Sequence, residues 1–195
     1  SNYWTSQIVL SQILHQVFSE NGIKSELKKI ESLKQWRSIM NGRVHVQIEV
    51  WQGTMEKHFN KAVKSGKAVS AGTHPAKTRE DWWYPNYVES VCPGLPNWKA
   101  LKKCAPKFSR GNGVKGVYLG GPWEKPDKAR IRALGLNFDI VRVKKSDDLW
   151  IELAKSFEKK EPIVLFNWTP NWIEAKYKGK FVEFPTWHKD CEEKA

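Results

Sequence analysis

An alternation of short apolar runs with amphipathic helical segments constrains the fold of this chain more than any other feature. Residues 44–50 alternate apolar and polar side chains, and residues 116–123, 138–143 and 163–166 contain short apolar runs bounded by turn residues. Period-two alternation and short apolar runs between turns are typical of β-strands. With helices between them, such strands predict an α/β fold with a mostly parallel sheet and helices on both sides.

Helical segments separate these strands, and several carry capping residues at their ends. Residues 5–20 repeat apolar side chains at helical spacing and stop at Asn21-Gly22, which predicts a helix with an apolar inner face. The residues of that face are Leu10, Ile13, Leu14, Val17 and Phe18. We expect further helices at residues 32–40, 99–108, 127–134 and 147–159, and a further strand at residues 23–30.

Charge and hydropathy limit the classes of function. The chain has a net charge of +12, and 40% of its residues are hydrophobic, without the run of about 18 apolar residues that spans a membrane. A strongly basic chain can bind nucleic acid or an anionic surface. The lysines are scattered along the sequence, however, which favours a solvated lysine-rich surface. A single-stranded nucleic-acid binder, with aromatic rings as stacking platforms, stays as the alternative function.

Three of the eleven tryptophans directly follow predicted strands and stand beside glycine or proline. They are Trp51, Trp123 and Trp168. In an open α/β sheet, ligands bind in the crevice outside the carboxyl ends of the strands. Indole faces that meet there attract a cation without hydrogen-bond donors, such as a quaternary ammonium group. The ordinary alternative is that these rings pack in the core.

Three more residues are candidates for the same site. Glu49 stands two residues before Trp51, on the same face of a regular strand, so we expect its carboxylate to complement a ligand cation or a proton on an N-oxide. A solvated or strand-paired carboxylate is the alternative. Trp4 begins a predicted helix, where backbone N–H donors suit a carboxylate, although core packing explains it equally. Trp82 and Trp83 face opposite sides of a strand, so at most one lines a given crevice, and we expect Trp82.

The three cysteines bear on the cellular compartment. Cys92 and Cys104 flank a turn and a short helical pattern at a spacing that a disulfide can bridge, and Cys191 is left over. We expect a Cys92–Cys104 disulfide and an extracytoplasmic location, with a pair of buried thiols in a cytosolic protein as the alternative. The sequence opens on Ser-Asn-Tyr-Trp without a signal peptide, so export implies that a leader has been removed.

Other chemistry finds little support in the sequence. The five histidines are dispersed, and the chain contains no HExxH, no glycine-rich phosphate loop and no nucleophile elbow. His188 and Cys191 lie close together near the end of the chain, but a metal site needs more ligands, and a surface tail is the expected role. We therefore expect no enzyme activity, no metal and no cofactor.

Four segments resemble one known family over essentially the whole chain. Residues 2–11, 49–51, 82–88 and 167–172 are similar to the glycine betaine/proline betaine substrate-binding proteins of ABC transporters. The most specific part is a Trp-Thr-Pro-x-Trp element that begins at Trp168, about 45 residues after the Gly-Pro-Trp turn that ends at Trp123. The resemblance implies an aromatic cage at the positions of Trp51, Trp123 and Trp168.

The resemblance also implies a type II-like periplasmic binding fold of two lobes that close over the ligand. We expect lobe one at residues 1–76, incomplete, and lobe two at residues 77–195. Family members begin with a strand before the segment that matches Trp4, and after lobe two they return to complete lobe one. We expect this chain to lack both that strand and that return segment.

The function that the resemblance implies is solute capture in the periplasm. Family members bind glycine betaine, proline betaine, choline, carnitine, trimethylamine N-oxide or dimethylsulfoniopropionate. We expect a monomeric extracytoplasmic solute-binding protein that passes such a methylated onium compound to the permease of an ABC importer and binds no nucleic acid.

Overall fold

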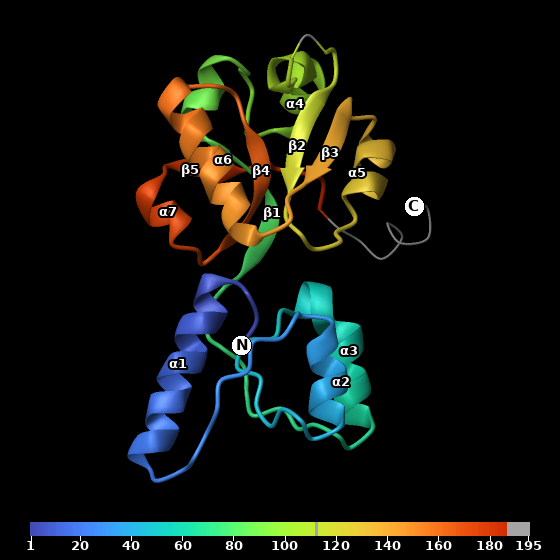
Figure 1. The fold of residues 1–195 in the computed structure, drawn as a ribbon. Helices are drawn as coiled ribbons and strands as arrows, with labels where there is room; N and C mark the ends of the chain where they lie inside the picture. The colour runs from blue at the N-terminus through green and yellow to red at the C-terminus, as the bar shows by residue number, and fades with distance from the viewer. Residues whose placement is uncertain (112, 187–195) are drawn as a thin grey trace. The chain divides into compact units, whose positions relative to one another are not determined.

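The computed structural model describes residues 1–111 and 113–186, which fall into two compact units (Figure 1). Unit 1 is Ser1–Pro75 and unit 2 is Ala76–Ala195. Each unit has buried apolar side chains of its own. In unit 1 they include Trp36, Met55 and Ala62, and in unit 2 they include Trp82, Trp83, Tyr118, Leu149 and Val164. Within the described ranges, no helix is both long and apolar enough to cross a membrane.

A five-stranded mixed sheet organises unit 2, in the order β3-β2-β4-β1-β5. The strands are β1 (Arg79–Pro85), β2 (Gly116–Gly120), β3 (Phe138–Arg142), β4 (Val164–Thr169) and β5 (Gly179–Phe181). The strands predicted in the regions of β2, β3 and β4 are confirmed, and β2 runs parallel to both β3 and β4. The sheet is mixed, because β1 pairs antiparallel with both β4 and β5. Strands β2, β3, β4 and β5 all run in one direction and β1 runs against them, so the expectation of a mostly parallel sheet is confirmed.

Helices flank this sheet, with α6 and α5 on either side of it in Figure 1. The helical elements of unit 2 are η1 (Asn86–Ser90), α4 (Trp98–Cys104), η2 (Ala105–Phe108), α5 (Asp127–Leu134), α6 (Ser146–Lys159) and α7 (Ile173–Lys176). Helix α6 buries Leu149 and Leu153 completely, one turn apart on one face. At its start, the Asp148 carboxylate accepts a hydrogen bond from the Lys145 backbone N–H at 3.0 Å.

The tryptophans of β1 lie in the core of unit 2. Trp82 stacks on Tyr118 of β2 with ring centroids 4.0 Å apart, and Trp83 is equally buried although adjacent side chains of a strand point to opposite faces. A Cβ atom at Gly179 would collide with the Trp83 ring and the Tyr84 carbonyl. Strand β5 therefore reaches β1 only because residue 179 has no side chain.

A disulfide joins Cys92 and Cys104, whose Cα atoms lie 5.6 Å apart. It ties the segment after η1 to the last residue of α4, and it lies within unit 2. This Cα separation is within the range usual for disulfides in proteins.

Unit 1, all of whose residues are described, contains helices and no strand. Its helices are α1 (Thr5–Glu20), α2 (Lys34–Met40) and α3 (Gln52–Lys64). The strands predicted at residues 23–30 and 44–50 are therefore wrong. A strand needs a neighbour to complete its ladder of hydrogen bonds, and neither segment pairs with one.

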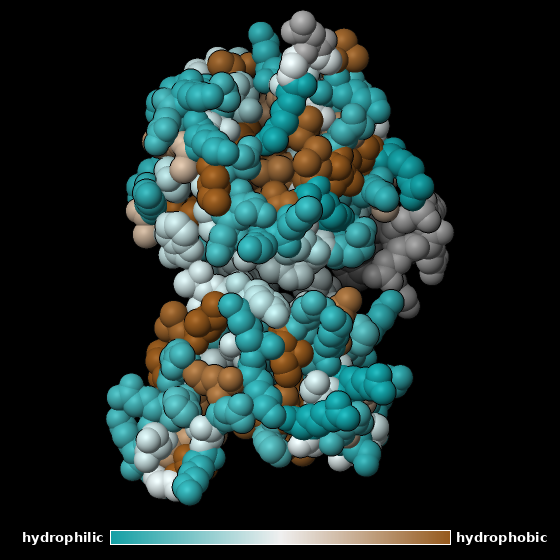
Figure 2. Space-filling view, viewed as in Figure 1, coloured by the Kyte–Doolittle hydropathy of each residue, from teal (hydrophilic) through white to brown (hydrophobic). Residues whose placement is uncertain are grey.

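The expected inner face of α1 is wrong in part: Leu10, Leu14 and Phe18 are half-buried, but Ile13 and Val17 are exposed and polar side chains hold the most buried positions. Gln7 and Ser11 are buried, whereas the side chain of Ile13 is 53% exposed. The Gln7 amide donates hydrogen bonds to the Gln47 side chain at 2.6 Å and to the Glu49 carbonyl at 3.3 Å. Apolar residues consequently remain at the surface of this unit, where Figure 2 shows them as brown patches among polar residues.

Candidate functional site

In unit 1, the Glu49 carboxylate joins the starts of two helices. One of its oxygens, Oε1, accepts hydrogen bonds from the Trp4 indole at 2.7 Å, the Trp51 indole at 2.6 Å and the Ser6 hydroxyl at 3.0 Å. Trp4 is the residue before α1, and Trp51 is the residue before α3. A single buried carboxylate thus fixes the directions of both indole N–H groups.

The second oxygen of this carboxylate is the unusual part of the arrangement. Oε2 of Glu49 is buried and makes no hydrogen bond within the described residues. Buried polar atoms are normally paired, and an unpaired one calls for an explanation such as an absent partner. The sequence grouped Trp4, Glu49 and Trp51 as candidates, and the structure brings these three together.

In unit 2, four aromatic rings meet at the carboxyl end of β4. Trp168 contacts Trp123 at 5.6 Å between ring centroids, with the planes almost perpendicular at 89°. Trp150 approaches Trp168 at 5.3 Å, and Phe166 approaches Trp168 at 5.8 Å. We call Trp123, Trp150, Phe166 and Trp168 the aromatic cluster. Two perpendicular indole planes form a corner whose walls can both face a compact cation.

Three different elements supply the tryptophans of the aromatic cluster. Trp168 comes from the end of β4, Trp123 from the loop between β2 and α5, and Trp150 from the first half of α6. Strand β4 ends at Thr169, and Pro170 follows, as expected of a proline that cannot extend the ladder. The cluster therefore lies at a strand end, where open α/β sheets bind ligands.

Trp150 and Phe166 are the members of the cluster that the sequence did not identify as candidates, and Trp150 is the tryptophan among them. Its helical spacing with Leu149 and Leu153 fits a core position, and its side chain is indeed buried. One signal in the sequence could have identified Trp150 as a site residue. Helix α6 begins at Ser146, shortly after β3 ends, and Trp150 lies one turn into this helix. A side chain in the first turns of this helix therefore lies near the carboxyl ends of the parallel strands.

Trp82 lies in the interior of unit 2, where its ring contacts the rings of Tyr118, Phe138 and Phe184. Its ring is fully buried, and its indole N–H donates to the Asp127 carboxylate at 2.9 Å. Burial raises the pKa of the Asp127 carboxyl, although the Trp82 hydrogen bond and the charges of Arg130, Arg142 and Lys125 oppose this rise. Within unit 2, Trp82 thus supports the start of α5.

Two other features of the chain do not add to the site. No group of three histidine, cysteine or acidic side chains could hold a metal ion among the residues that the structure describes. The predicted tail with His188 and Cys191 lies outside those residues. A groove of about 670 Å³ in unit 1 is lined by α1 and by parts of residues 23–28 and 43–48, and it includes none of the six candidate residues.

Comparison with protein families decides the class of the chain. Residues 1–192 match the family described as the substrate binding domain of the ABC-type glycine betaine transport system. The chain belongs to this family. Its members are extracytoplasmic substrate-binding proteins of ABC importers, so the resemblance in the sequence is confirmed.

A curated relative of this glycine betaine family supports the same assignment. The trimethylamine N-oxide-binding protein of Pelagibacter ubique (strain HTCC1062) is 36% identical over 96% of this chain. The chain spans 63% of the length of that protein.

Solved structures show the fold that the chain shares with the glycine betaine-binding family. The glycine betaine, L-proline-binding protein from Borrelia burgdorferi superposes with a TM-score of 0.77, at 20% identity, over 94% of this chain and 68% of its own. The lactococcal glycine betaine-binding protein, in its closed form with glycine betaine, gives 0.75 at 18% identity, over 95% of this chain and 69% of its own. The α/β periplasmic binding fold is therefore confirmed.

Proposed function

We propose that this chain captures a methylated onium compound outside the cytoplasm for an ABC importer, with trimethylamine N-oxide, glycine betaine and choline as the first candidates and carnitine and dimethylsulfoniopropionate as further ones. The observation that carries the proposal is the aromatic cluster, in which Trp123 and Trp168 meet at right angles at the end of a buried strand. Its support from outside the structure is the glycine betaine family and the trimethylamine N-oxide-binding relative.

Indole rings supply the attraction for such a ligand. Each well-placed, desolvated ring contributes on the order of 2 kcal/mol to cation binding. The two rings of unit 2, from Trp123 and Trp168, then give about 4 kcal/mol, or a dissociation constant of roughly 1 mM before other contacts are counted. Trp51 is a further proposed ligand-binding residue, in unit 1. A trimethylated nitrogen suits these rings because it cannot donate hydrogen bonds to a carboxylate.

Glu49 supplies the polar part of the proposed site. Its free Oε2 complements the positive charge of a trimethylammonium group, or shares a proton with the oxygen of an N-oxide. Trp4 and Trp51 hold the carboxylate in place through Oε1 and leave Oε2 for the ligand. We propose only a supporting role for Trp82, rather than the expected place in the crevice wall, because its ring is fully buried and its indole N–H donates to Asp127.

The partners follow from the same assignment. We propose that the protein acts as a monomer, passes its ligand to a membrane permease, catalyses no reaction and works in the periplasm. The Cys92–Cys104 disulfide fits an oxidising compartment outside the cytoplasm.

The test is calorimetric titration of the purified protein with glycine betaine, choline, carnitine, trimethylamine N-oxide and dimethylsulfoniopropionate. We expect at least one of these compounds to bind, and we expect Trp168→Ala to abolish that binding with little loss of fold by far-UV circular dichroism. The matched control is Trp98→Ala, which removes a half-buried indole of α4 outside the aromatic cluster.

A wild-type protein that binds none of the five compounds would contradict the proposal, and so would two further outcomes. One is unimpaired binding by Trp168→Ala, which would make this ring a core residue only. The other is tight binding to single-stranded oligonucleotides that weakens steeply with salt, because such a dependence is typical of phosphate contacts. Onium binding to aromatic faces is expected to change little with salt.

A further inference from the structure

The loop that carries Trp123 is held by one arginine from the neighbouring strand. This loop, residues 121–126, joins β2 to α5, and Arg142 is the last residue of β3. Gly120 and Arg142 are register partners where β2 and β3 pair in parallel, so the arginine side chain starts beside the beginning of the loop.

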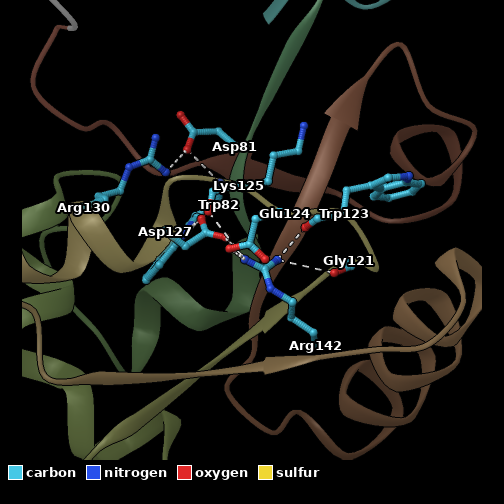
Figure 3. Close-up of polar contacts among 9 residues, drawn as sticks. All are labelled: Asp81, Trp82, Gly121, Trp123, Glu124, Lys125, Asp127, Arg130 and Arg142. Atoms are coloured by element: carbon cyan, nitrogen blue, oxygen red, sulfur yellow. Dashed lines mark hydrogen bonds and ion pairs between the residues drawn. The ribbon is translucent and has the colours of Figure 1, made fainter. Parts of the chain in front are cut away.

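The Arg142 guanidinium reaches both the backbone and the acidic side chains around this loop (Figure 3). Nη1 donates to the Trp123 carbonyl at 2.6 Å and to the Gly121 carbonyl at 3.5 Å. Nη2 lies 3.5 Å from the Lys125 carbonyl, 3.3 Å from a Glu124 carboxylate oxygen and 3.5 Å from an Asp127 carboxylate oxygen. The shortest of these contacts is to the carbonyl of Trp123 itself.

The glycines at the start of the loop leave room for this arrangement. A Cβ atom at Gly120 would lie 3.2 Å from Nη1 of Arg142. A Cβ atom at Gly121 would lie 2.7 Å from the Trp123 ring and 3.3 Å from the Phe166 ring. The Trp123 indole therefore folds back over Gly121 toward Phe166, which its ring approaches at 5.7 Å between centroids.

Two of the six residues of the loop, Pro122 and Pro126, have no backbone N–H to donate to its carbonyls. The Arg142 guanidinium donates to three of these carbonyls, those of Gly121, Trp123 and Lys125. A guanidinium offers five N–H groups in a fixed plane, which can bridge several acceptors at once, whereas a lysine ammonium is a single point charge. The contacts of Arg142 use this property.

We propose that Arg142 is a positioning residue, which sets the Trp123 ring against Trp168 by fixing the carbonyls of the loop. Arg142 acts on the ligand only through Trp123, and this part of the proposal rests on the proposed onium-binding function. We propose that Arg142, the glycines at 120 and 121 and the prolines at 122 and 126 together determine the position of the Trp123 ring in the aromatic cluster.

The test compares Arg142→Met and Arg142→Lys with wild type in the full chain. The first readout needs no ligand: it is the ¹H–¹⁵N indole resonance of Trp123, assigned by its absence in Trp123→Phe. We expect both arginine variants to shift this resonance. Arg142→Lys should restore little of the wild-type chemical shift, because lysine lacks the planar set of N–H donors of a guanidinium. The control is Arg132→Met, which removes an exposed arginine of α5 and should leave the resonance in place.

The second readout is calorimetric affinity for whichever panel compound binds wild type. We expect Arg142→Met to weaken binding about tenfold, in line with the loss of hydrogen bonds to a charged group. In a Trp123→Phe background, Arg142→Met should lower the affinity much less, because Arg142 acts on the ligand through Trp123.

The outcomes separate the two proposals. An unchanged Trp123 resonance in Arg142→Met, or full rescue by Arg142→Lys, would overturn the positioning role. An additive loss in the Trp123→Phe background would overturn it as well. A wild-type protein that binds no panel compound, while Arg142→Met still shifts the resonance, would overturn the proposed function and support the positioning of the loop.

Discussion

Glu49 concentrates three hydrogen bonds on one carboxylate oxygen and leaves the other without a partner. A purely structural carboxylate gains most by sharing donors between its two oxygens, because each lone pair that is buried unpaired costs free energy. The uneven distribution agrees with the proposed ligand-binding role of Glu49, in which one oxygen fixes the orientation of the carboxylate and the other is left for the ligand. The sequence predicted the participation of Glu49 from its spacing with Trp51, but the role of Trp4 as a donor to the same oxygen depends on a contact between residues 45 positions apart.

We predict that Glu49→Gln weakens the binding of choline roughly tenfold, because the amide removes a charge–cation contact while keeping an acceptor for the indoles. Trimethylamine N-oxide should lose less affinity, since the new amide N–H can donate to its oxygen. Calorimetry measures both. Glu31→Gln is the control, because Glu31 is an exposed partner of Lys34 in the same unit. Unchanged choline affinity in Glu49→Gln would remove this residue from the site.

At the scale of elements, the helices were predictable, whereas the absence of strands from unit 1 was not. Helix α1 ends at Glu20, followed by Asn21 and Gly22, because a glycine with φ of 72° stops the helix by a local rule. Residues 44–50 have the alternation of a strand, but pairing depends on a neighbour that the alternation cannot reveal. The same limit hid the antiparallel position of β1 in unit 2, since its partners lie far along the chain.

We predict that Asp148→Ala destabilises unit 2 by about 1 kcal/mol, because it removes the side chain that caps the backbone N–H of Lys145 at the start of α6. Asp147→Ala is the matched control. It removes an exposed acidic residue from the same turn, and by weakening only the interaction with the helix dipole it should cost only about 0.3 kcal/mol. Urea denaturation measures both, and equal losses would contradict the capping role of Asp148.

At the scale of the whole molecule, the sequence predicted the two members of the aromatic cluster that stand at strand ends, Trp123 and Trp168. Trp168 was a candidate because a buried strand precedes it and a proline follows shortly after it. Trp150 and Arg142 were missed because their spacing is that of an ordinary core residue and an ordinary strand-end charge. Their importance arises from contacts that only the folded chain creates, with the Trp168 ring and with the loop that carries Trp123.

We predict that the two units unfold independently of each other, because each has buried apolar side chains of its own. The Cys92–Cys104 disulfide, with a sequence separation of 12, lies in unit 2, and residues 1–75 contain no cysteine. Constraint of the unfolded chain by a loop of this size contributes about 3 kcal/mol, so Cys92→Ala/Cys104→Ala should destabilise unit 2 by that amount. Hydrogen exchange followed by mass spectrometry should show weaker protection in peptides of β1, β2 and β4. Peptides of α1 and α3 should exchange as before, because each unit has its own buried core. Cys191→Ser serves as the control for removal of a cysteine. An equal loss of protection in both units would show that they unfold together as one cooperative structure.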